Sequence, residues 1–280
     1  MMRQAFSVEW FKLRRLRLFR AVVLLGIALS CFWVAFGLWM ARRGGPAVRE
    51  EFAQRLTFPG AYEQAFGLAA AFGETFLAIV AATFVANEYG WGTWRLILLT
   101  GLPRWQELAA KFLALCTGAG IFVVAVALVP LVAAPLIARS LGYPALAIPR
   151  ADGWLVAAFL LPVRAVGSLV APITLAFAST VWTRSQSVAV GVTVGLVLSE
   201  GVLAALLQGI GGWWAKLPQF FYLWNAEAIA RAPAFSEAAV PGMPPLGHAI
   251  AVVLAWTVTL AAATIWWFAR RDIEVRSNSA

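Results

Sequence analysis

The stretch Ala21–Ala41, AVVLLGIALSCFWVAFGLWMA, decides the fold because it contains no charged side chain. A helix that crosses the hydrocarbon core of a bilayer needs about 20 consecutive apolar residues. Arginines flank the stretch, with Arg20 before it and Arg42 and Arg43 after it. The stretch therefore predicts a transmembrane helix rather than a helix from the core of a soluble domain.

The composition of the whole chain agrees with this prediction. Of its 280 residues, 62% are hydrophobic and only 12% are charged, whereas a soluble domain is about 45–50% apolar and about 25% charged. A water-soluble fold of this size has no place for so much apolar surface. The composition excludes an ordinary soluble enzyme and a disordered chain, and it indicates a polytopic membrane protein.

Five further apolar segments follow the first. We expect an all-α integral membrane protein with six transmembrane helices, at about 21–41, 64–86, 112–138, 153–182, 188–207 and 246–269. Six helices leave little chain for a soluble domain, so residues 1–280 form a single transmembrane domain. More basic residues fall on the side of both termini than on the other side, which predicts cytoplasmic termini.

The sequence lacks the residues that several kinds of catalytic or metal site need. No lysine follows a glycine, so the chain has no phosphate-binding loop for hydrolysing a nucleotide. Cys31 and Cys116 lie inside apolar runs and His248 is the single histidine, which leaves no cluster of metal ligands. The net charge of +9 comes from arginines beside apolar runs, so we expect membrane lipids and not nucleic acid as a partner.

The segment before the first span is basic and amphipathic, over about residues 3–18. Phe6, Trp10 and Leu13 recur at helical spacing, while Lys12 and Arg15 belong to the basic residues between and after them. Such a helix can lie on an anionic membrane surface. The alternative interpretation is a solvated basic tail.

The loop between the second and third spans, NEYGWGTWRLILLTGLPRWQELAAKF (Asn87–Phe112), carries the signals of a short helix. Thr93 can cap its start, Gly101 can end it, and Pro103 suits the first turn of the next span. We expect a helical elbow that projects from the membrane and fits a groove on a partner protein. The charged side chains available for contacts with the partner would be Glu88, Arg95, Arg104 and Glu107. An ordinary connecting loop is the alternative.

The pattern of this loop resembles the signature of the ABC type 2 permease family, the membrane subunits of ATP-driven exporters. The resemblance rests on Glu88, on Gly92-Thr93-Trp94-Arg95, on Gly101 and on Pro103-Arg104, with Lys111 following. Glu9-Trp10, Lys12-Leu13 and Arg15, before the first span, resemble the same family. The six-span layout also agrees, so the resemblance covers nearly the whole chain.

The resemblance implies a permease subunit with no cofactor of its own and no catalytic residues. A separate ABC-type ATP-binding subunit would bind ATP and Mg, and a second copy or a related permease would complete the pathway. The coupling helix would dock on the ATPase through Glu88, Gly92, Thr93, Arg95 and Arg104, and the interfacial elbow would include Trp10, Lys12 and Arg15. The implied location is a bacterial or archaeal plasma (inner) membrane.

Three charged residues fall inside the predicted spans: Glu74, Arg164 and Glu200. A charge at the centre of a span costs about 2.5–3.5 kcal/mol on insertion scales, so it usually faces the protein interior or water. The three lie at a similar depth, and we hypothesise that Arg164 pairs with Glu74 or Glu200. They either fix the packing of the helices or line a substrate or ion path.

Other features of the last two spans also leave alternatives. Gly191 and Gly195 form a G-x-x-x-G pattern that suits packing within one subunit or a dimer seam. The aromatic segment from Trp213 to Trp224 predicts interfacial or re-entrant helices on the external face, which act as a gate or only as a membrane anchor. His248 is expected to be a boundary residue rather than a proton relay.

The substrate class stays open between a lipid, a hydrophobic peptide and an amphiphilic drug. The main functional alternative is a secondary transporter or channel that an ion gradient drives. A scaffold or immunity protein without transport activity is another. An intramembrane protease is disfavoured, because the E-E-x-x-x-R match at Glu50–Arg55 falls in a polar loop without companion histidines.

Overall fold

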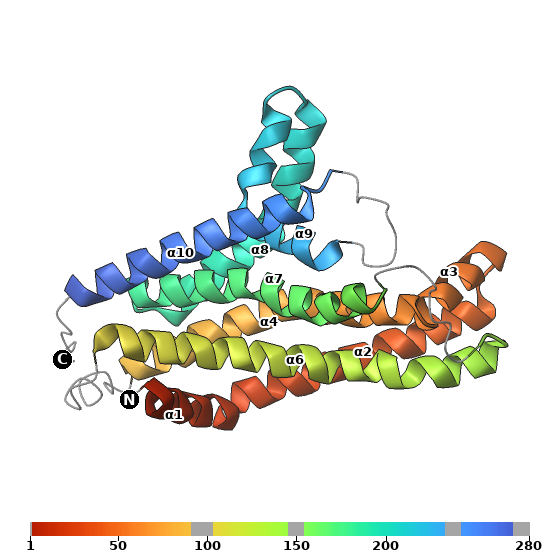
Figure 1. The fold of residues 1–280 in the computed structure, drawn as a ribbon, viewed down its shortest axis with the longest axis horizontal. Helices are drawn as coiled ribbons and strands as arrows, with labels where there is room; N and C mark the ends of the chain where they lie inside the picture. Colours follow the sequence, from red (N-terminus) through yellow and green to blue (C-terminus); the bar gives the residue numbers. More distant parts are fainter. Residues whose placement is uncertain (1, 91–102, 145–153, 233–241, 271–280) are drawn as a thin grey trace.

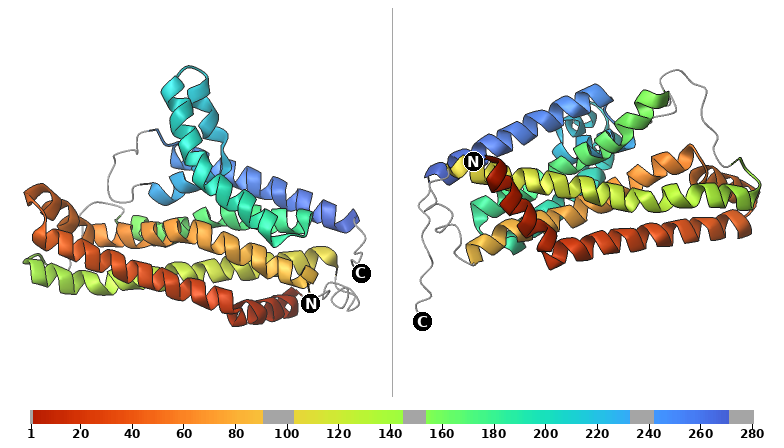
Figure 2. Two further views of the ribbon diagram at one scale, coloured as in Figure 1. Left: turned by 180° about the vertical axis from the view of Figure 1, so that it is seen from behind. Right: turned by 60° about the horizontal axis from the view of Figure 1, so that its bottom comes forward.

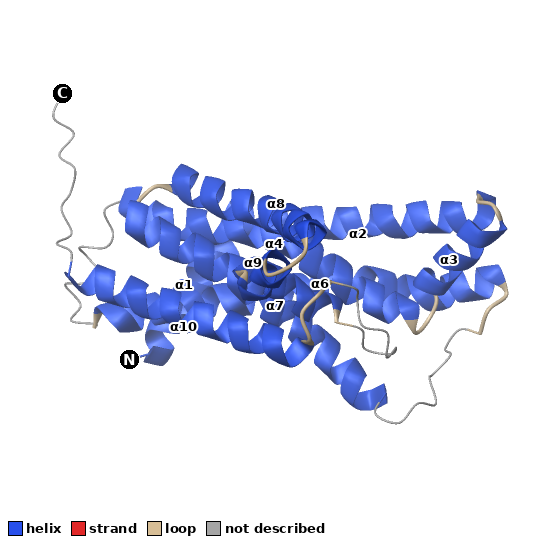
Figure 3. Cartoon of the chain, turned by 90° about the horizontal axis from the view of Figure 1, so that it is seen from above, coloured by secondary structure: helices blue, strands red, loops and turns tan. Residues whose placement is uncertain are grey.

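A computed structural model describes residues 2–90, 103–144, 154–232 and 242–270. Within these ranges every regular element is a helix, as Figure 3 shows. Six helices are long and apolar enough to cross a membrane: α2 (Arg17–Arg43), α4 (Gly60–Gly90), α6 (Arg104–Leu141), α7 (Trp154–Thr183), α8 (Gln186–Ile210) and α10 (Leu246–Arg270). The prediction of an all-α protein with six transmembrane helices is confirmed.

Four shorter helices complete the described chain: α1 (Met2–Arg15), α3 (Pro46–Leu56), the 3-10 helix η1 (Trp214–Phe220) and α9 (Tyr222–Arg231). Most of the long helices run along the long axis of the molecule (Figure 1). One end of this bundle, which we call the terminal end, holds α1, the last turns of α4 and α10 and the first turns of α6 (Figures 1 and 2). The other end, called the opposite end, holds α3 and the start of α4.

Helix α4 lies at the centre of the bundle, and a larger share of it is buried than of any other candidate span. It packs against α7, α6 and α8. Small side chains allow these close approaches, since Ala65, Ala69, Ala78 and Ala81 are almost fully buried. At Gly73 the contact is closest, because a Cβ atom there would lie 2.7 Å from Leu169 Cδ2.

Helix α8 is the least buried of the candidate spans and leaves the bundle at a steep angle (Figures 1 and 2). Its chain turns at Gly211 and Gly212, both with positive φ, and η1 returns alongside it. The outer face of α8 exposes large apolar side chains, at Leu198, Val202, Leu206 and Ile210. Such a surface suits hydrocarbon or another apolar helix and not water.

A bulkier residue at position 73 tests the packing at the centre of the bundle. We expect Gly73→Leu to lower the free energy of unfolding by about 1–3 kcal/mol, because Leu169 is fully buried and has little room to move. The matched control is Gly120→Leu on α6, where an added Cβ meets nothing within 4 Å. Unfolding of the detergent-solubilised protein by SDS measures both; equal stabilities of the two variants would contradict the packing.

Candidate functional site

Charged side chains from three helices meet inside the protein at the terminal end. Glu9 and Lys12 come from α1, Glu88 comes from the last turn of α4, and Glu107 and Lys111 come from the first two turns of α6. We call these five residues the charge cluster. Lys111 is completely buried, and the three glutamates are almost as deeply buried.

The ammonium group of Lys111 is the centre of the charge cluster. It donates hydrogen bonds to Glu9 Oε2 and to Glu88 Oε1, the latter at 2.7 Å, and Glu107 Oε1 lies 4.0 Å away. Lys12 lies at the edge and is partly exposed; it donates to Glu9 Oε1 and, at 2.9 Å, to Glu88 Oε1. Glu9 and Glu88 are therefore each shared by both lysines, which connects all three helices.

Helical periodicity explains why these residues face inward. On α1 the buried residues are Ala5, Glu9 and Leu13, which are spaced by four and so share one face. Helix α1 approaches α6 closely because α6 has a glycine, Gly118, where a Cβ would lie 3.0 Å from Leu13 Cδ2. Glu107 and Lys111 are also four residues apart, so both face α1 from α6.

The pairing keeps the groups on α1 charged although they are shielded from water. Burial alone raises the pKa of Glu9, but Lys111 and Lys12 outweigh it and hold that pKa below its ordinary value of 4.5. Burial alone lowers the pKa of Lys12, but its hydrogen bonds and charge interactions with Glu9 and Glu88 outweigh it and raise that pKa above 10.5. Both groups are thus ionised throughout the neutral range.

The three carboxylates could also hold a cation. One oxygen from each of Glu9, Glu88 and Glu107 lies within 4.8 Å of the other two. The Lys111 ammonium, however, already binds two of these carboxylates and lies near the third. A metal ion would have to displace it, so the arrangement is that of an internal ion network rather than a metal centre.

The charge cluster lies at the base of the loop in which the sequence predicts a coupling helix. Glu88 precedes the loop, and Arg104, Glu107 and Lys111 follow it. Arg104 Nη1 donates to the carbonyl groups of Phe268 and Ala269, near the end of α10, both at 3.2 Å. The two ends of the loop are therefore bound to α1 and to the last turn of α10.

The structure corrects one expectation about this loop. Glu88 and Glu107 are not exposed for contacts with a partner. Both are buried, because their carboxylates face lysines on α1 and α6 inside the protein. Arg104 binds the end of α10, as described above. Gly92, Thr93 and Arg95 lie outside the described residues, and the docking role of this set stays a prediction.

The N-terminal segment forms helix α1. Its predicted elbow residues Trp10, Lys12 and Arg15 lie in three different environments. Trp10 is half-buried and packs against the main hydrophobic core, and Lys12 belongs to the charge cluster. Arg15 is exposed, with its guanidinium 4.4 Å from the centre of the Phe11 ring. Helix α1 thus packs against the bundle with one face and exposes a basic and aromatic face.

The hypothesis that Arg164 pairs with Glu74 or Glu200 is wrong for the described structure. Glu200 Oε2 instead accepts hydrogen bonds from the backbone N–H groups of Leu223 and Trp224, at 2.8 and 2.9 Å. Arg164 Nη1 donates to the carbonyl of Ala232, at 3.2 Å.

Helix α9 explains why the two charges do not meet. Glu200 binds N–H groups in its first turn, and Arg164 binds the carbonyl just after its last residue. Backbone groups at helix ends lack intrahelical partners, and the helix dipole favours an anion at the first end and a cation at the second. Both charges therefore stabilise α9, a packing role that sequence spacing alone does not reveal.

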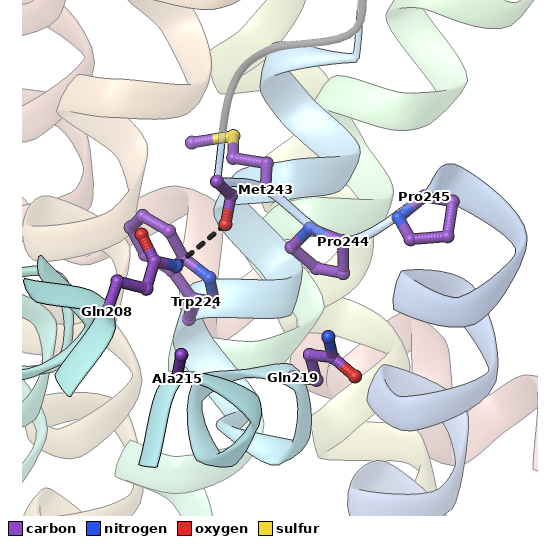
Figure 4. A pocket seen from close by; sticks show the side chains of 8 residues that line it. Gln208, Ala215, Gln219, Trp224, Met243, Pro244 and Pro245 are labelled. Atoms are coloured by element: carbon purple, nitrogen blue, oxygen red, sulfur yellow. Dashed lines mark hydrogen bonds between the residues drawn. The ribbon is translucent and has the colours of Figure 1, made fainter. Parts of the chain in front are cut away.

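A pocket of about 370 Å³ lies between the end of α8, η1, α9 and the residues before α10 (Figure 4). Its lining is uncharged and consists of Gln208, Ala215, Gln219, Trp224, Gly242, Met243, Pro244 and Pro245. Gln208 Nε2 closes one side by donating to the Gly242 carbonyl at 2.8 Å. His248, near this pocket, binds the Gln219 carbonyl through Nε2 at 2.8 Å.

The sequence did not predict that Glu9, Glu107 and Lys111 meet inside the protein; Glu107 was expected as an exposed contact of the loop, and Glu9 and Lys111 entered only as part of the family resemblance. A usable signal was present, because acidic and basic residues lie three or four apart on both segments, at Glu9–Lys12 and Glu107–Lys111. Long charged residues beside a span usually reach toward water, and only the packing of α1 onto α6 shows that these point inward.

Together, the six apolar helices and the charge cluster at the terminal end define a helical membrane protein in which buried ion pairs join α1, α4 and α6. In a comparison with protein families, residues 5–200 match the family described as ABC-2 family transporter protein. The chain therefore belongs to the ABC-2 family of transporter proteins. A comparison with curated proteins gives no match.

Removal of the central ammonium tests the charge cluster. We expect Lys111→Met to destabilise the protein by about 3–5 kcal/mol, because it leaves buried carboxylates without their main counter-ion. Lys216→Met is the matched control, since Lys216 is exposed on η1 and its loss should change stability by less than about 0.5 kcal/mol. SDS unfolding measures both, and similar values for the two variants would contradict the buried network.

The pKa shifts predict how the docking of α1 depends on pH. Because the pKa of Glu9 is lower in the folded protein, its stabilisation is complete above its ordinary pKa of 4.5 and is lost as pH falls through the folded value. Because the pKa of Lys12 is raised, its contribution is complete below 10.5 and is lost as pH rises through the folded value.

Hydrogen exchange of the α1 amides, corrected for the intrinsic pH dependence of exchange, measures this dependence. We expect constant protection at neutral pH and a loss on acidification that is smaller in Glu9→Gln. An identical acid profile in the wild type and Glu9→Gln would show that Glu9 is not the group responsible.

Proposed function

We propose that this chain is the permease subunit of an ATP-driven exporter, which works with a separate ATP-binding subunit. Membership of the ABC-2 family supports this proposal, as do the apolar helices. ATP and Mg would bind to the partner, since the sequence has no phosphate-binding loop. The terminal end would face the cytoplasm of a bacterial or archaeal cell, as the distribution of basic residues predicts.

The position of the charge cluster is the single observation that carries the coupling proposal. Residues 91–102 connect α4 and α6 at the terminal end, and both of these helices share buried ion pairs with α1. Residues on each side of the loop therefore cannot move independently without breaking buried ion pairs. A partner that pushes on the loop would move α1 and the ends of α4 and α6 together.

Arg104 extends this connection to α10 through its bonds to Phe268 and Ala269. A binding event changes a conformation only if the partner contacts the two states differently. In this proposal the loop provides that differential contact when the ATP-binding subunits close. The bound helices then carry the motion along their length to the opposite end.

A second permease, either a copy of this chain or a related one, would complete the pathway. Two observations on α8 support this part of the proposal. Its outer face exposes large apolar side chains, and among the described residues a Cβ at Gly191 or Gly195 would meet no atom of another helix within 4 Å. The G-x-x-x-G surface is thus open to a helix from another subunit.

Site-specific photocrosslinking tests the docking of the ATP-binding subunit. We expect a photoreactive amino acid at Arg95, in the loop, to crosslink to a phosphate-loop ATPase in native membranes. The control is the same amino acid at Arg139, near the end of α6 at the opposite end. Mass spectrometry identifies the crosslinked protein.

Two outcomes would contradict the proposal. Equal crosslinking of the ATPase from positions 95 and 139 would show that the ATPase does not contact the loop specifically. Purification of the intact chain without any ATPase, combined with transport driven by an ion gradient, would favour a secondary transporter or channel.

A further inference from the structure

A second cavity, larger than the pocket of Figure 4, opens toward the opposite end of the bundle. It has a volume of about 720 Å³ and lies between α3, α4, α7 and α9. Helix α3 contributes Gln54 and Arg55, α7 contributes Leu161, and α9 contributes Arg231. The remaining wall is mainly the first half of α4.

The wall from α4 consists mainly of small and polar residues on one face of the helix; Glu63, which has a partner, and Leu68 complete it. Gln64, Gly67 and Ala71 line the cavity and follow one another at spacings of three and four. Ala71 is exposed although α4 is the most buried of the long helices, and a Cβ at Gly67 would meet nothing within 4 Å. The exposure of this face is thus due to the cavity.

Glu74 continues the same face one turn further into the bundle. It lies 14 residues beyond the start of α4 at Gly60, or about 21 Å along a helix that rises 1.5 Å per residue. Within the described residues, the Glu74 carboxylate forms neither a hydrogen bond nor an ion pair. A carboxylate at this depth without a partner is costly in a membrane protein.

The other charges around the cavity already have partners. Arg55 pairs with Glu51 at 2.7 Å, and Arg231 pairs with Glu227 at 2.5 Å. Arg164 binds the Ala232 carbonyl instead of an acid. Among the described charges that act on Glu74, Glu227 is itself negative and Arg231 is shared with it. Glu74 therefore has no cation of its own among the described charges.

We propose that this cavity is a binding site for an amphiphilic organic cation, with the cationic group beside Glu74. The ammonium group of such a molecule would supply the counter-ion that the protein does not provide. Its apolar part would lie against Gly67, Ala71 and Leu161, where α4 and α7 leave room. The volume is that of a drug-sized molecule and not of a bare ion. Binding here requires no ATP, so the site can exist whether or not the chain is an exporter subunit.

Binding of rhodamine 6G, an amphiphilic cation, tests the site directly. The probe is titrated against the full chain in phosphatidylcholine nanodiscs without ATP, and empty nanodiscs correct for partition into lipid. Fluorescence anisotropy should show saturable binding that Glu74→Gln weakens at least tenfold. Gly67→Phe should also weaken binding, because it fills the cavity without changing any charge.

Glu200→Gln is the matched control, since Glu200 is also a glutamate within a span but caps α9. This variant should bind the probe like the wild type, and melting temperatures confirm that each variant is folded. Unchanged affinity in Glu74→Gln or in Gly67→Phe would overturn the proposal. Equal binding of fluorescein, an anion with the same ring system, would overturn the assignment to a cation.

Discussion

The buried ammonium group of Lys111 is the interaction on which the terminal end of this protein depends. Buried carboxylates remain charged only if cations compensate them. Lys111 and Lys12 form ion pairs with Glu9 of α1 and Glu88 of α4, and Glu107 of α6 lies 4.0 Å from Lys111. A buried ion pair often adds little net stability compared with apolar packing, but removing one partner strongly destabilises the protein because the other charge stays buried without a counter-ion. The charge cluster therefore specifies how the three helices meet.

This constraint gives the two ends of the bundle different properties. At the terminal end, buried ion pairs and the bonds from Arg104 to the end of α10 connect the four helices α1, α4, α6 and α10. At the opposite end, the small residues Gly67 and Ala71 of α4 line a cavity, and Glu74 follows on the same face of the helix. This division suits the proposed function, in which one end would transmit force from a partner while the other would admit or release a molecule.

The helical architecture could be predicted from the sequence because membrane insertion imposes a simple rule on length and hydropathy. The residues of the site could be predicted only in part. Glu88 is prominent in the loop pattern, but its burial depends on Lys111, 23 residues later, and on Glu9 in another helix. The sequence predicts that Arg164 pairs with Glu74 or Glu200, but the two ends of α9 bind Arg164 and Glu200 separately. Backbone groups without an intrahelical partner compete with side chains for a charge.

The most direct test of the central claim is a distance measurement between α1 and α6 in the complex with the proposed ATP-binding subunit. Spin labels at Ser7 and Thr117, both exposed, would report this distance with and without ATP. If the charge cluster joins the helices into one unit, the distance distribution stays the same in both states and broadens in Lys111→Met. A wild-type distance that changes on addition of ATP would show that α1 and α6 move independently, and it would contradict the account.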